Sequence, residues 1–104
     1  MSSVDYYPKV SVIILTYNAK QLLGDILDMA ISSALNQTYR NMEVLIVDNG
    51  SSDETANYIE SRYQDKVKVV RFCKNYGYCL GNNLATRYVD EDSKYLLFMN
   101  SDVV

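Results

Sequence analysis

Acidic and amide side chains follow the apolar stretches of this sequence, and Asp48 is the first whose position could serve chemistry. It ends the stretch 42–48 (MEVLIVD). A carboxylate there can accept a hydrogen bond from an imide N–H, such as that of uracil or thymine. The alternative is that Asp48 only caps the following turn, which is a common use of aspartate. Position alone leaves both roles open.

Asn100 and Asp102 form a second candidate, directly after the last apolar stretch. An Asn-x-Asp pair can offer oxygen ligands to a hard divalent cation that also keeps water and diphosphate ligands. Such a cation would neutralise the charge that develops on a departing diphosphate. An isolated Asn-x-Asp is more often a turn than a metal site, so spacing alone does not decide between them.

The third candidate is the loop that contains Asn75, Gly77 and Gly81. Glycine recurs where a side chain could stand, which would let a phosphate or ribose approach the backbone closely. An ordinary loop that leads into a helix fits equally well. The segment lacks the G-x-G-x-x-G order, and the chain has no G-x-x-x-x-G-K-[ST] phosphate loop.

Alternating strands and helices must position these residues. The apolar runs predict strands at 10–16, 42–48, 66–72 and 95–100, with amphipathic helices at 22–35, 51–63 and 81–89 between them. Ser51 and Glu54 have the spacing of a capping box that opens the second helix. This β-α-β-α-β-α-β order predicts a mainly parallel sheet with helices on both faces. Ligands of such sheets bind at the carboxyl ends of the strands, where the candidates lie.

The third and fourth predicted strands differ in charge. Lys66, Lys68 and Arg71 interrupt the third, which favours a solvent-facing edge strand. The fourth, YLLFM before Asn100, has no charged residue and is typical of the middle of a sheet. The acidic run 90–92 before it is typical of a solvated turn.

Composition narrows the class of protein. The 104 residues, 48% hydrophobic and 22% charged, suit one folded domain. Ten basic side chains are scattered among thirteen acidic ones, so no nucleic-acid partner is expected. The chain has no histidine, which excludes Ser-His-Asp and Cys-His sites and histidine-bound zinc within it. Neither a signal-peptide core nor a membrane span is evident, so we expect a cytoplasmic protein with Cys73 and Cys79 reduced and partly buried.

Four segments in register resemble the family 2 glycosyltransferases of GT-A fold, from Val10 to Val104. They are VSVIILTYN, SALNQTYRNMEVLIVDNGSSDET, NYGYCLGNNLA and LLFMNSDVV. NYGYCLGNN and NSDVV are most similar to the rhamnosyltransferase-like branch. The resemblance implies a three-layer α/β/α, Rossmann-like half of a GT-A fold with sheet order 3-2-1-4. Residues 1–104 would be a truncated nucleotide-sugar-binding domain with residues 1–8 as its tail.

The resemblance also implies roles for single residues. Thr16, Tyr17 and Asn18 would line the nucleoside pocket, with Asp48 reading the pyrimidine. Asn75 and Gly77 would lie near the ribose and phosphates, and Asp102, with Asn100, would bind Mg or Mn through the diphosphate. Asn100 departs from the family's D-x-D motif, in which the first position is usually Asp.

These observations favour the donor-binding portion of a transferase that moves a sugar from UDP- or dTDP-sugar to a glycan or lipid-linked acceptor. In the full-length protein we expect it to lie at the inner membrane surface. The alternative is a nucleotide-binding module without turnover. A receiver-like signalling domain fits poorly, because the first strand ends in Thr-Tyr-Asn rather than in acids. No general base remains unassigned, so we expect the isolated chain to be inactive and to contain no catalytic residue. The unguarded fourth strand predicts a homo-oligomer.

Overall fold

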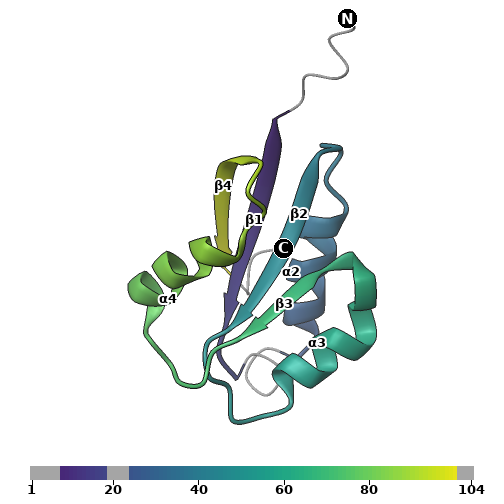
Figure 1. Ribbon diagram of the computed structural model, residues 1–104. Coiled ribbons are helices and arrows are strands. Elements are labelled where there is room, and N and C mark those ends of the chain that lie inside the picture. The colour runs from purple at the N-terminus through teal and green to yellow at the C-terminus, as the bar shows by residue number, and fades with distance from the viewer. Residues whose placement is uncertain (1–7, 19–23, 101–104) are drawn as a thin grey trace, which may run out of the picture.

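The computed structural model describes residues 8–18 and 24–100, which form a sheet covered by helices on both faces (Figure 1). Leu22 and Leu23 of the first predicted helix, and Asp102 of the predicted metal pair, lie outside the described residues. Within that part of the chain, no helix is long and apolar enough to cross a membrane.

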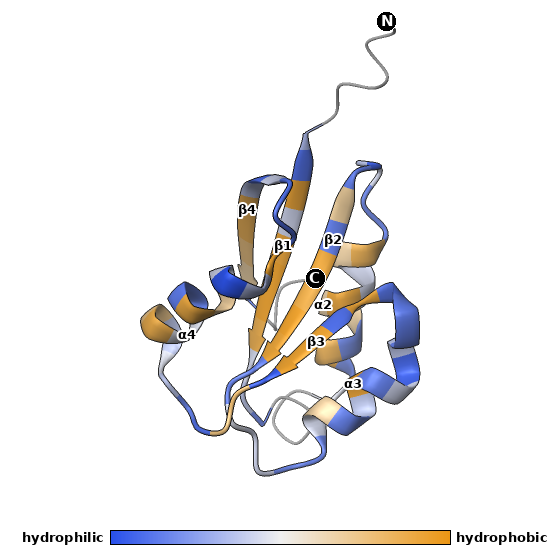
Figure 2. Ribbon diagram, in the orientation of Figure 1, coloured by the Kyte–Doolittle hydropathy of each residue, from blue (hydrophilic) through white to orange (hydrophobic). Residues whose placement is uncertain are grey.

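The sheet has the predicted order, β3-β2-β1-β4, and every neighbouring pair is parallel. Its strands are β1 (Lys9–Thr16), β2 (Met42–Asp48), β3 (Lys68–Arg71) and β4 (Ser93–Asn100). The two central strands are rich in β-branched residues and almost wholly buried, so they form the hydrophobic centre of the sheet (Figure 2). The chain adds β2 and β3 on one side of β1 and then returns to add β4 on the other. That reversal creates the switch point where ligands of such sheets bind.

Helices α2 (Asp25–Leu35) and α3 (Thr55–Tyr63) cover one face of the sheet. Leu27 and Ile31 of α2 and Ile59 of α3 are fully buried against Val12 and Ile14 of β1. The buried positions of α2 recur every three or four residues, as the sequence predicted. Burial of each such side chain contributes roughly 1.5–3 kcal/mol, so this layer carries much of the stability.

The opposite face is covered by α4 (Tyr78–Ala85), whose Ala85 packs on Ile13, Leu45 and Val47. The sequence predicted this helix at 81–89, and the start was wrong by three residues. Gly77 has φ 80°, a conformation that favours glycine, and α4 begins directly after it. After Ala85 the chain tightens into a 3₁₀ turn, Thr86–Tyr88.

The predicted capping box at the start of α3 is wrong. The helix begins at Thr55, where Asp53 Oδ1 accepts the Thr55 backbone N–H over 2.9 Å. Ser51 instead lies in the preceding turn, where its hydroxyl accepts the Asn18 backbone N–H over 2.8 Å. A tertiary contact with the end of β1 has replaced the local cap.

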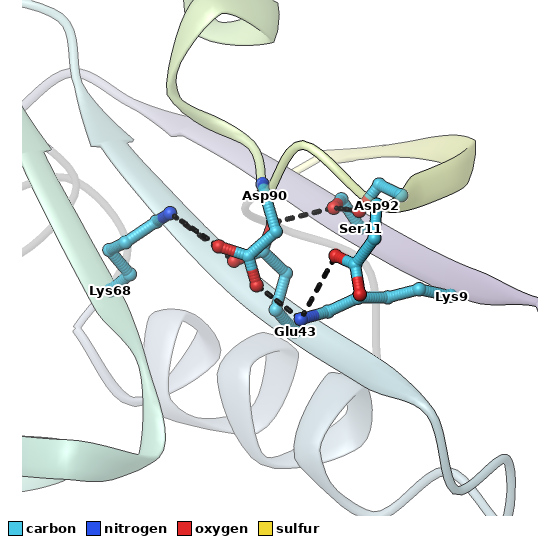
Figure 3. A network of polar contacts seen from close by, with 7 residues as sticks. Lys9, Ser11, Glu43, Lys68, Asp90 and Asp92 are labelled. Atoms are coloured by element: carbon cyan, nitrogen blue, oxygen red, sulfur yellow. Dashed lines mark hydrogen bonds and ion pairs between the residues drawn. The ribbon is translucent and has the colours of Figure 1, made fainter.

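A network of polar contacts joins the amino ends of the strands (Figure 3). Glu43 Oε2 accepts the Ser11 hydroxyl over 2.6 Å and the Asp90 backbone N–H over 2.8 Å. Lys9 forms an ion pair with Asp90, and Lys68 Nζ lies 3.3 Å from Glu43 Oε1. The acidic run 90–92 is therefore not simply a solvated turn, because Asp90 ties the start of β4 to β1, β2 and β3. The Lys9 ammonium holds the pKa of Asp90 below its usual value.

The two edges of the sheet differ as their charges predicted, but β4 is not a central strand among the described residues. At the β3 edge, Arg71 pairs with Glu60 and donates to Asn57 Oδ1 over 2.7 Å. Lys66 lies in the 3₁₀ turn Gln64–Lys66 rather than in β3. On β4, large apolar side chains are exposed on both faces: Tyr95, Leu96, Leu97 and Phe98.

Candidate functional site

The carboxyl ends of β1 and β2 bring Thr16 and Asp48 side by side as register partners. Both side chains are buried, and the Thr16 hydroxyl donates to Asp48 Oδ1 over 3.3 Å. The Ser51 hydroxyl donates to the same oxygen. Asp48 is thus joined through its side chain to the turn that carries Ser51. Both of these hydrogen bonds use Oδ1.

Asn18 holds the end of β1 against the turn after β2. Its backbone has φ 49°, and its side-chain Oδ1 accepts the backbone N–H groups of Ser52 over 2.8 Å and Asp53 over 3.2 Å. An asparagine tolerates this left-handed conformation better than most residues. These contacts give Asn18 a role in shaping the site, and it does not line the pocket described next.

An open pocket of about 290 Å³ lies beside these strand ends. Four of the predicted nucleotide-binding residues line it: Thr16, Tyr17, Asn75 and Gly77. Asp48 and Asn18 are not among its lining residues. The fold therefore brings together residues from the end of β1 and from the loop after β3, which are distant in the sequence.

Asn49 and Tyr78 also line the pocket, and the sequence analysis did not select them. Asn49 is buried, and its side-chain amide contacts Asn75, Tyr76 and Gly77. The available signal was its place directly after a buried strand. Tyr78 is the first residue of α4 and is exposed.

The loop after β3 carries aromatic and thiol groups next to the pocket. The Tyr76 ring meets Phe72 edge to face, with ring centroids 5.5 Å apart. A contact with the Cys73 thiol raises the pKa of the Tyr76 phenol. Cys73 and Cys79 are free, as expected, but both are exposed, so the prediction of partial burial is wrong.

Asn100 ends β4 and is exposed, opposite Leu15, another residue that lines the pocket. Its amide oxygen fits the oxygen ligands that Mg²⁺ and Mn²⁺ accept. Among residues 8–18 and 24–100, no three His, Cys, Asp or Glu side chains gather closely enough to hold a metal ion. A divalent cation beside Asn100 would therefore need further ligands besides the acidic and thiol side chains of residues 8–18 and 24–100.

A second cavity, of about 440 Å³, lies at the other end of the sheet. It is lined by Ser32, Leu35, Asn36, Tyr63 and Lys66. None of these belongs to the predicted site, and the group offers no carboxylate that could act as base or metal ligand. The pocket at the carboxyl ends is therefore the candidate site.

An open parallel sheet with polar residues gathered at its switch point defines a nucleotide-binding α/β domain. The family model for glycosyl transferase family 2 matches residues 11–104, and the chain belongs to that family. The chain is thus a glycosyltransferase domain, as its sequence motifs indicated.

Two relatives from bacteria illustrate the similarity. An uncharacterized glycosyltransferase of Haemophilus influenzae is 34% identical over 97 residues, which cover 91% of this chain and 28% of that protein. The UDP-Glc:alpha-D-GlcNAc-diphosphoundecaprenol beta-1,3-glucosyltransferase WfaP of Escherichia coli is 36% identical over 98 residues, 89% of this chain and 35% of that protein. The chain spans about a third or less of the relatives it matches.

Among solved structures, TarS 1-349 of S. aureus in complex with UDP-GlcNAc superposes with a TM-score of 0.75. It is 29% identical, and the match covers 90% of this chain and 26% of that one. The likeness confirms the GT-A fold that the sequence motifs implied. The rhamnosyltransferase-like branch stays a prediction.

Proposed function

We propose that this chain is the donor-binding portion of a glycosyltransferase that takes its sugar from a UDP- or dTDP-sugar. The observation that carries the proposal is the pocket at the carboxyl ends of β1 and β2, lined by Thr16, Tyr17, Asn75 and Gly77. Tyr17 offers an exposed aromatic face to a base, and the glycine lets a phosphate approach the backbone. TarS, which has the same fold, was solved with UDP-GlcNAc.

Asp48 and Asn18 belong to this proposal even though neither lines the pocket. Asp48 is 5% exposed and lies beside Thr16 as its register partner, with Oδ1 engaged by two hydroxyls. In this proposal the Asp48 carboxylate accepts the imide N–H of a pyrimidine when the donor binds. Asn18 would act by holding the turn that keeps Asp48 in place.

Asn100 and Asp102 are the proposed ligands of Mg²⁺ or Mn²⁺, together with water and the donor's diphosphate. Asn100 stands at the end of β4 next to Leu15 of the pocket, which is a suitable place for the diphosphate. When bound, the cation would neutralise the charge of the leaving diphosphate. The chain's own part would be to hold that diphosphate beside Gly77 and Asn75.

Calorimetric titration with UDP, dTDP and GDP, each with and without Mn²⁺, tests the donor class. We expect UDP or dTDP to bind more tightly than GDP, and Mn²⁺ to strengthen binding. Asp48→Asn separates the two roles of Asp48, because its amide oxygen can still accept from Ser51 and Thr16. If Asp48 reads the base, this variant loses UDP affinity while its unfolding free energy changes little.

Asp65→Asn is the matched control. Asp65 is exposed in the 3₁₀ turn Gln64–Lys66, at the other end of the sheet, and the substitution makes the same change of charge. It should bind UDP as the parent does. Equal UDP binding by Asp48→Asn and the parent would show that Asp48 only caps the turn. No binding of any of the three nucleotides would refute the donor site.

We further propose that the 104-residue chain binds the donor without transferring the sugar. Activation of an acceptor hydroxyl needs a base within hydrogen-bonding reach. The described pocket lining holds no carboxylate and no histidine. Purified chain that glycosylates an added glycan or lipid-linked acceptor at a steady rate would contradict this; slow donor hydrolysis would not.

We also propose an acceptor and a place of action, which the similarity to WfaP supports. WfaP is named for a diphosphoundecaprenol acceptor, which supports a lipid-linked acceptor here as well. We propose that the full-length protein acts in the cytoplasm at the inner membrane surface, because a lipid-linked acceptor is held in a membrane. Partition of the full-length protein between membrane and soluble fractions of a cell lysate tests the location.

The chain on its own is also proposed to pair with a second copy through β4. Among the residues that the structure describes, no ion pair guards β4 as Arg71 and Glu60 guard β3, and Tyr95, Leu96, Leu97 and Phe98 are each at least 40% exposed. Unguarded apolar edges pair readily with other strands. Light scattering of the parent should give a dimer mass, and Leu97→Lys should give a monomer. A monomeric parent would refute the pairing.

A further inference from the structure

Asn49 occupies an unusual position between two parts of the site. It follows β2 directly, and its side chain is 2% exposed. Its backbone N–H donates to the Thr16 carbonyl over 2.7 Å, which fixes it to the end of β1. From there its side chain reaches toward the loop after β3, residues 73–77.

The Asn49 amide uses both of its donors and its acceptor on that loop. Nδ2 donates to Asn75 Oδ1 over 2.9 Å and to the Gly77 carbonyl over 3.1 Å. Oδ1 accepts the Tyr76 backbone N–H over 3.0 Å. The Gly77 backbone N–H donates to Asn75 Oδ1 over 2.8 Å, so the Asn75 side chain must present its oxygen, and not its amide nitrogen, on this side. The Asn49 amide must then turn its Nδ2 toward that oxygen.

The loop is seated closely on the turn that carries Asn49. A Cβ added to Gly50 would lie 2.4 Å from the Lys74 carbonyl carbon and 2.6 Å from the Asn75 nitrogen. On the other side, a Cβ added to Gly81 of α4 would lie 3.0 Å from Asn49 Nδ2. Asn49 is thus packed between the turn, the loop and α4.

We propose that Asn49 is a positioning residue for donor binding, which holds the loop 73–77 so that Asn75 and Gly77 face the nucleotide. The inference rests on the proposed function, because Asn75 and Gly77 matter only if a donor occupies the pocket. Asn49 acts through these two residues. Both Nδ2 donors and the one hydrogen bond that Oδ1 accepts are directed at that loop.

Two substitutions test the role. Asn49→Asp keeps the shape and the acceptor for Tyr76 but places a carboxylate against Asn75 Oδ1 and the Gly77 carbonyl, so the loop should be released. Asn49→Ala removes all three hydrogen bonds. Each should weaken UDP binding by about tenfold or more, since tenfold corresponds to the loss of roughly one net hydrogen bond. Asn83→Ala, at an exposed position of α4, is the control and should bind UDP as the parent does.

Amide hydrogen exchange in the free chain separates positioning from a general structural role. We expect exchange at Tyr76 and Gly77 to rise by about tenfold or more in both variants, while core amides such as Ile46 keep their protection. Asn75→Ala should add little further loss of UDP affinity on top of Asn49→Ala, because the two side chains act as one unit.

Three results would overturn the proposal. The first is unchanged UDP affinity and unchanged Tyr76 exchange in both variants. The second is faster exchange throughout the core, which would make Asn49 an ordinary stabilising residue. The third is full additivity with Asn75→Ala. If the parent binds no nucleotide, the donor site itself fails, and exchange at Tyr76 and Gly77 still decides whether Asn49 holds the loop.

Discussion

Thr16 and Asp48 end neighbouring parallel strands as register partners, and the Thr16 hydroxyl donates to Asp48 Oδ1 over 3.3 Å. Ser51 donates to the same oxygen, and the Asn18 backbone donates to Ser51. One carboxylate therefore gathers the ends of β1 and β2 and the turn that follows. These hydrogen bonds hold Thr16, which lines the candidate site, in place before any ligand binds.

Thr16→Val should destabilise the chain by about 1–2 kcal/mol, because it removes a buried donor to a carboxylate at nearly constant volume. Urea denaturation measures the change. Thr86→Val is the control, since its hydroxyl donates to the Asn83 carbonyl at an exposed position, and it should cost less than about 0.5 kcal/mol. Equal losses in the two variants would show that the Thr16–Asp48 contact contributes nothing.

Gly50→Ala should cost on the order of 3 kcal/mol or more, because the added Cβ would lie 2.4 Å from backbone of Lys74 in addition to the strain at φ 80°. Gly77→Ala is matched, with the same φ and no atom within 4 Å of its added Cβ. It should cost only the conformational strain of φ 80° with ψ 173°, about 1–3 kcal/mol. Denaturation of both variants measures the difference, and a Gly50→Ala variant no less stable than Gly77→Ala would contradict the close approach of the loop.

Stability should fall as the pH rises from 10 to 12, and Tyr58 should cause part of the fall. The hydrogen bond to Asp28 raises the pKa of Tyr58 from 10.0 to about 12. A raised pKa in the folded state means that this stability is complete below pH 10 and is lost as the pH passes through about 12. Unfolding free energies at pH 9, 10 and 11 should decline less steeply for Tyr58→Phe than for the parent.

Tyr95→Phe provides the comparison for this pH series, since Tyr95 is 61% exposed on β4. Its decline with pH should match that of the parent. If Tyr58→Phe also matches the parent, the contact between α3 and α2 through Asp28 does not contribute to alkaline stability.

Glu43→Gln should destabilise the chain by about 1–2 kcal/mol. The glutamine oxygen can still accept from Ser11 and the Asp90 N–H, but its amide group would face Lys68 in place of a carboxylate. Glu91→Gln is the control, because Glu91 is exposed in the turn that also contains Asp90, and it should have almost no effect. Thermal or urea unfolding measures both, and equal stabilities would mean that the network in Figure 3 does not anchor β4.

The sequence by itself determined the sheet and the end at which the site lies. The runs at 10–16 and 42–48 are β-branched and uninterrupted, so they had to become the buried central strands. The charges at Lys68 and Arg71 favoured an edge for β3, and the order β3-β2-β1-β4 agrees. Once parallel strands are fixed, the residues that follow them must gather at one edge.

Only the tertiary structure decided which of those residues face the pocket. Asp48 and Asn49 are adjacent in sequence, yet one turns to Thr16 and Ser51 and the other to the loop 73–77. Ser51 has the spacing of a capping box and instead accepts from Asn18, which lies 33 positions away. Local spacing carries no information about such partners, because they come from distant segments that meet only when the sheet has formed and the loop is seated on Gly50.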